Sequence, residues 1–153
     1  MKNISLILAF LSCWLVAQAQ KSMTFEQAKA AGLFERLDTI YSPGIDTDTS
    51  KAVFKDEKAY ISAYQEFIAQ FSQYLAKNKF KWGKQTRCFN KIYFSKSGKV
   101  DYFLYNFKEG EISETQAVEF ERLLKKFIKK AKFKLKPTAR FSQCSPVKYA
   151  DAN

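Results

Sequence analysis

Aromatic and aliphatic residues recur at helical spacing between residues 57 and 77, and this stripe constrains the fold more than any other feature. On a helical wheel the stripe occupies one arc of roughly 140°, which is typical of a helix that packs against a core. Asp56 precedes the stripe and is suited to cap the first turn. The sequence therefore predicts a long helix over about 57–77. The members of the stripe are Tyr60, Ile61, Tyr64, Phe67, Ile68, Phe71, Tyr74 and Leu75.

Three segments further along have the composition of β-strands. Residues 88–95 and 100–108 are rich in aromatic and β-branched side chains, and the turn residues 96–99 between them predict a hairpin. Pro137 ends any helix that precedes it, and residues 138–149 predict a last strand. Both strands of the hairpin carry apolar residues on both faces. One face is therefore expected to pack under helices, and the other either forms a wide aromatic surface or supports a second layer.

Two capping boxes mark the starts of further helices. Thr24 is followed by Gln27 three residues later, and Ser113 is followed by Gln116 in the same way. The first box predicts a short helix over 25–31, with a second short helical turn over 33–41. The second box predicts a helix over 114–131.

These elements define the expected fold class. It is α+β, with a helical N-terminal part, residues 20–80, packed on a small antiparallel sheet in the order α-α-β-β-α-β. Residues 20–153 are expected to form a single domain, because about 130 residues suffice for one core. Within it, residues 88–149 form a ββαβ unit.

The N-terminal segment has the pattern of a signal peptide rather than of a folded element. Lys2 supplies a positive charge, residues 4–16 are mostly apolar, and residues 17–19 form an Ala-x-Ala cleavage site. We expect residues 1–19 to be removed near Ala19-Gln20, which makes the protein periplasmic or secreted. The apolar stretch is too short to span a bilayer, so a transmembrane protein is not expected. The alternatives are an uncleaved anchor, a buried helix, or a lipoprotein attached through Cys13.

Two cysteines remain after that cleavage, Cys88 and Cys144. Two thiols in an exported protein predict one disulfide, which would tie the first strand of the ββαβ unit to its last. The alternative is a pair of separate buried thiols.

The composition argues against catalysis. The chain of 153 residues contains no histidine, which excludes histidine-based hydrolases and histidine-ligated metals. No nucleophile–base pair and no metal-ligating set is present, so no enzyme activity, metal or cofactor is expected. A calcium loop over 46–57 is disfavoured because Lys51 stands where the sharp turn needs glycine.

Basic residues are concentrated in the C-terminal half. The net charge is +11, and nine basic residues without an acid occur between Arg122 and Arg140. The Lys-rich segment 122–136 predicts a surface for anionic lipid or glycan, although a charge run of this kind is also typical of a solvated helix face. Nucleic acid is not an expected partner, because aromatic strands of this composition usually form a sheet face under helices. The candidate anion-binding residues are Arg122, Lys125, Lys126, Lys129, Lys130 and Lys132.

Residues 89–149 resemble the C-terminal domain of TonB-type energy transducers. The similar features are the segment Ile92–Val100 with its Gly98 turn, the helix ending before Pro137, and the final strand Phe141–Tyr149. The resemblance implies a three-stranded antiparallel sheet with a helix packed on it. It also implies that short peptide segments of outer-membrane receptors bind by strand addition.

The function expected from these features is that of an exported, non-enzymatic interaction protein. A partner protein of the cell envelope would add a strand at an exposed edge of the hairpin or of the last strand. The alternative is an envelope-associated protein held to anionic lipid or glycan by the Lys-rich helix.

Overall fold

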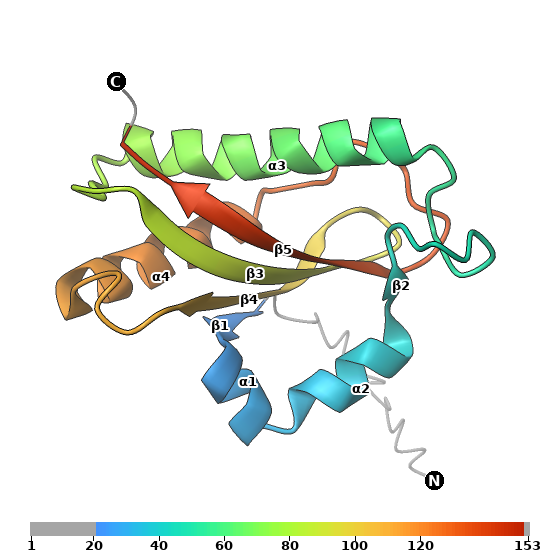
Figure 1. Cartoon of the computed structure of the whole chain (residues 1–153), viewed down its shortest axis with the longest axis horizontal. Coiled ribbons are helices and arrows are strands. Elements are labelled where there is room, and N and C mark those ends of the chain that lie inside the picture. Colours follow the sequence, from blue (N-terminus) through green and yellow to red (C-terminus); the bar gives the residue numbers. More distant parts are fainter. Residues whose placement is uncertain (1–20, 152–153) are drawn as a thin grey trace, which may run out of the picture.

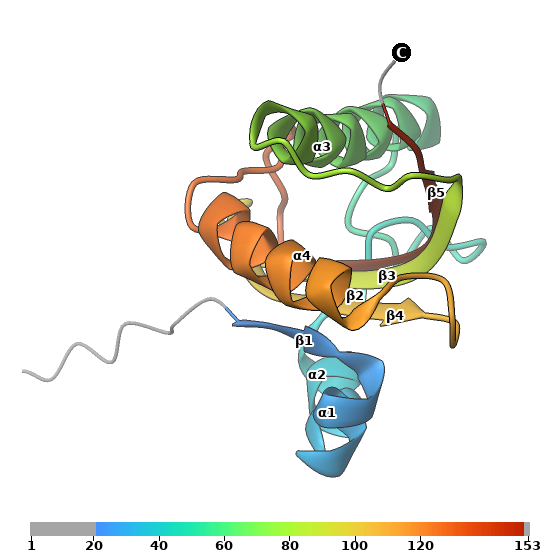
Figure 2. The same ribbon diagram turned by 90° about the vertical axis from the view of Figure 1, so that its left-hand side faces the viewer.

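A computed structural model describes residues 21–151 and shows a sheet with helices on both faces (Figure 1). Two helices lie on one face and two on the other, which Figure 2 shows from the side. The predicted α+β class is confirmed. The elements in chain order are β1 (Lys21–Thr24), α1 (Phe25–Ala30), α2 (Leu33–Ile40), β2 (Ser42–Pro43), α3 (Glu57–Lys77), β3 (Thr86–Phe94), β4 (Val100–Phe107), α4 (Glu114–Ile128) and β5 (Phe141–Tyr149).

The sheet is mixed, so the predicted antiparallel sheet is wrong for its two edges. The predicted order α-α-β-β-α-β is also wrong, because it lacks β1, β2 and one of the three helices that precede β3. The strand order of the sheet is β1-β4-β3-β5-β2. The three central strands pair antiparallel, as expected, but β1 pairs parallel with β4 and β2 pairs parallel with β5. The two edge strands contain only four and two residues, so neither is long enough to produce a detectable alternation of apolar and polar side chains.

The helix starts follow the capping signals of the sequence. Thr24 and Ser113 each complete a capping box, and the Asp56 carboxylate accepts a hydrogen bond from the Ala59 backbone N–H at 2.9 Å. The long helix α3 has the predicted bounds. Helix α4 ends at Ile128, three residues earlier than predicted.

The core is divided by the sheet into two clusters. The larger lies between the sheet and helices α3 and α4, and includes the fully buried rings of Phe71, Phe103 and Phe120. The smaller lies between the sheet and helices α1 and α2, around Leu37 and Tyr93. The helices of the N-terminal part therefore cover both faces of the sheet, with α1 and α2 on one side and α3 on the other (Figures 1 and 2).

The signal peptide predicted over residues 1–19 lies outside the described residues. Within residues 21–151, no helix combines the length and the apolar character needed to cross a membrane.

Candidate functional site

The two cysteines do not form the predicted disulfide. Both thiols are free; Cys88 is buried and Cys144 is exposed. Strand register explains the difference: Cys88 pairs with Val147 and Cys144 pairs with Lys91, so the cysteines are offset by three positions on neighbouring strands. An odd offset directs two side chains to opposite faces of a sheet. Burial raises the pKa of the Cys88 thiol to about 12.

The six candidate anion-binding residues divide into two groups. Arg122 and Lys125 make ion pairs of 2.6 Å with Glu119 and Glu121 on the same helix. The other four have no ion pair with any residue between 21 and 151. The ion pairs of α4 therefore neutralise the two candidates nearest its middle, and leave the lysines at its C-terminal end available.

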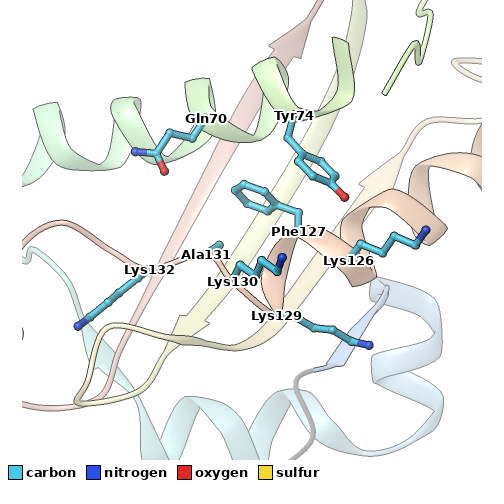
Figure 3. Close-up of a pocket in the computed structure, with 8 residues that line it drawn as sticks. All are labelled: Gln70, Tyr74, Lys126, Phe127, Lys129, Lys130, Ala131 and Lys132. Atoms are coloured by element: carbon cyan, nitrogen blue, oxygen red, sulfur yellow. The ribbon is translucent and has the colours of Figure 1, made fainter. Parts of the chain in front are cut away.

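The four unpaired lysines surround a recess between α3 and the end of α4 (Figure 3). The recess has a volume of about 630 Å³, and aromatic and aliphatic side chains line it between the amines. Figure 3 shows the lysine side chains spread around the aromatic rings rather than converging on one point. We name this surface the lysine recess; its lining residues are Gln70, Tyr74, Lys126, Phe127, Lys129, Lys130, Ala131 and Lys132.

Strand β5 has an open edge along most of its length. Strand β2 pairs with it only at Phe141 and Ser142, and the Gly44 N–H makes the last bond, to the Ser142 carbonyl oxygen at 3.1 Å. The chain then leaves the sheet towards α3. From residue 143 to residue 149, no described strand lies beside β5 on that side. We name this stretch the open edge.

The direction of the backbone groups on the open edge follows from two observations. The carbonyl oxygens of Arg140 and Ser142 point towards β2, where they accept hydrogen bonds from Ser42 and Gly44. Alternate residues of a strand point the same way, so the backbones of Cys144, Pro146 and Lys148 also point outward. Pro146 has no N–H. Because its backbone points away from β3, the missing N–H removes no hydrogen bond between β5 and β3. The open edge offers outward N–H groups at residues 144 and 148 only.

A groove runs between the open edge and helix α3. Its volume is about 620 Å³, and its walls are mostly apolar. Two hydrogen bonds join the walls, from the Tyr60 hydroxyl to Gln143 Oε1 and between the Tyr64 and Ser145 hydroxyls, both at 2.6 Å. The residues that line this β5 groove are Ile45, Tyr60, Ile61, Tyr64, Gln65, Ile68, Ala69, Gln143, Ser145, Pro146, Val147 and Lys148.

Two features of the open edge oppose pairing with a second copy of the chain. Proline and lysine are the residues that natural proteins place on edge strands to prevent self-association, and Pro146 and Lys148 both lie here. The net charge of +11 adds repulsion between copies. The groove itself was not predicted from the sequence. The signal that indicates it is Pro146, because proline inside a strand marks an edge.

The described residues contain no cluster of three or more His, Cys, Asp or Glu side chains that would hold a metal ion. No family model matches the chain, and neither does any curated protein or solved structure.

Proposed function

We propose that the protein binds an extended segment of a partner protein, which adds a strand to β5 and fills the β5 groove. The observation that supports this function is the combination of outward backbone N–H groups at residues 144 and 148 with an apolar groove beside them. The outward carbonyl oxygen of Cys144 accepts a hydrogen bond from Gln143 Nε2 at 2.9 Å, which an added strand would replace. Main-chain hydrogen bonds supply affinity in this mode of recognition, and pockets for alternate side chains supply specificity.

The two faces of the added strand would contact different surroundings. This difference defines which side chains the partner segment should carry at alternate positions. Side chains directed towards α3 enter the groove beside Ile61, Ile68 and Val147, so apolar residues fit there. Side chains on the other face lie beside the exposed Cys144, Pro146 and Lys148, and Arg87 of β3 is the register partner of Lys148. Acidic residues suit this basic face. The expected partner segment alternates apolar and acidic side chains.

The cellular setting belongs to the same proposal. The predicted signal peptide places the protein in the periplasm or outside the cell, and the partner is accordingly a protein of the cell envelope. The proposed role is binding rather than catalysis. The resemblance of residues 89–149 to the C-terminal domain of TonB-type energy transducers stays a prediction, and strand addition is the role that it implies.

A peptide titration tests this function. The probe is a short acetylated peptide that alternates valine and glutamate, with binding measured by calorimetry. Ala69 is exposed on α3 and lines the groove, so Ala69→Trp should fill the groove and weaken binding at least about tenfold. Ala76→Trp adds the same volume at an exposed position of α3 outside the groove, and should bind like the unsubstituted protein. If both variants bind the peptide equally well, the β5 groove is not the binding site.

A further inference from the structure

We propose that the lysine recess docks the protein onto the surface of an anionic phospholipid bilayer. This is a second binding surface and does not depend on strand addition. Its occupant is indicated by charge, by the spread of the amines and by the apolar residues between them.

The charge of the recess is not compensated within the described protein. Of the nine basic residues between 122 and 140, Arg122, Lys125 and Lys134 make ion pairs with glutamates. The four lysines of the recess make none with any residue from 21 to 151. All four are exposed, so their charge acts outward on a binding partner.

The arrangement of the amines favours a surface over a small ligand. In Figure 3 the four lysine side chains point in different directions around the recess, so a compact anion would reach only one or two of them. Lysine also acts as a point charge, without the fixed fork with which arginine grips a single phosphate. A bilayer surface carries many phosphates and can meet all four amines together.

Apolar side chains occupy the space between the amines. The half-buried ring of Tyr74 lines the recess together with the small exposed parts of Phe127 and Ala131, each of which is 8% exposed. Interfacial binding needs apolar area as well as electrostatic attraction, and aromatic rings with a polar group are suited to the headgroup level. These features suit the headgroup level of a bilayer, and the test below distinguishes this occupant from an acidic glycan.

The recess and the β5 groove share no residue and use opposite flanks of α3. At about 100° per residue, Gln70 and Tyr74 lie across the helix from Ile61, Gln65 and Ile68. A protein docked through the recess therefore keeps its groove accessible to a partner strand.

Vesicle sedimentation tests this proposal with the purified protein. We expect binding to vesicles of phosphatidylglycerol mixed with phosphatidylcholine and none to pure phosphatidylcholine, with a steep loss as salt rises. Replacing the four recess lysines by glutamine should weaken binding by more than about 100-fold, because each lysine near the surface contributes about fivefold. These four substitutions are K126Q, K129Q, K130Q and K132Q.

A control variant carries the same change in net charge at residues that already have ion pairs. It combines K51Q, R122Q, K125Q and K134Q. The control should keep most of the binding; equal losses in both variants would show an effect of net charge alone and overturn the site. If the protein does not bind the vesicles but binds an acidic polysaccharide through the recess, the surface is a glycan site and the proposal is overturned. Circular dichroism verifies that both variants fold, and both should bind the valine–glutamate peptide normally.

Discussion

The Tyr64 hydroxyl on α3 lies 2.6 Å from the Ser145 hydroxyl on β5. This contact joins the helix wall of the groove to its strand wall, at the centre of the open edge. A second contact of the same kind, from Tyr60 to Gln143, lies one helical turn earlier. The groove is therefore held at a fixed width by two tyrosines of the stripe from which the fold was predicted.

Tyr64→Phe should remove that bond and little else. We expect the free energy of unfolding to fall by about 1 kcal/mol, the usual net value of one hydrogen bond. Urea denaturation at neutral pH measures the change. Tyr74→Phe is the control, because the Tyr74 hydroxyl makes no hydrogen bond within the described chain and should be dispensable. Equal stability of the Tyr64 variant and the control would show that the contact contributes nothing.

Alkaline pH should destabilise the protein, and Tyr64 is one cause. Burial raises the pKa of Tyr64 to about 12 from an ordinary value of 10.0. The folded state holds the phenolic proton more tightly than the unfolded state, so this contribution is complete below pH 10 and is lost as the pH rises towards 12. The loss amounts to about 2–3 kcal/mol for this residue. Urea midpoints between pH 8 and 11 should fall, and should fall less steeply in Tyr64→Phe. A flat profile would contradict the burial of the hydroxyl.

Gly44→Ala should destabilise the fold through a steric clash. A Cβ at this position would overlap the hydroxyl and ring of Tyr60, just after β2 ends and the open edge begins. Overpacking of this kind costs roughly 1–3 kcal/mol. Thermal unfolding measures the loss. A variant as stable as the natural chain would mean that β2 does not approach α3 so closely.

The two thiols should react at very different rates. Cys144 is exposed, so it should react with iodoacetamide in the folded protein, whereas the buried Cys88 should react only after unfolding. Partial burial raises the pKa of Cys144 above the usual 9.0, so its labelling rate should still increase when the pH passes 9. Mass spectrometry of the labelled protein counts the modified thiols. An unlabelled protein lighter by two hydrogens would show a disulfide instead.

Two kinds of element could be predicted from the sequence. Some are long enough for their apolar residues to repeat at a regular spacing, and others begin at a recognisable helix-capping residue. The stripe over 57–77 repeats through several turns, and the capping boxes at Thr24 and Ser113 identify helix starts by local chemistry. The hairpin is recognisable from its turn. These local signals predict α1, α3, α4 and the hairpin of β3 and β4, and Pro137 marks the start of the segment that contains β5.

The remaining features depend on contacts between distant parts of the chain. Strands β1 and β2 form opposite edges of the sheet and pair with strands that lie far along the chain, and two to four residues carry no period of their own. The relation of Cys88 to Cys144 depends on the β3–β5 register, which counting cysteines does not give. The lysine recess also depends on such contacts, because Gln70 and Tyr74 of α3 form one wall and the residues at the end of α4 form the other.

Amide hydrogen exchange along β5 tests the open edge most directly. In the free protein the amides of Cys144 and Lys148 should exchange quickly, because they point away from β3, while those of Ser145 and Val147 should be protected. Saturation with the valine–glutamate peptide should slow exchange at Cys144 and Lys148 by at least about tenfold, as a new strand accepts their hydrogen bonds. Protection of both amides in the free protein, or rapid exchange at both in the peptide complex, would contradict strand addition at β5.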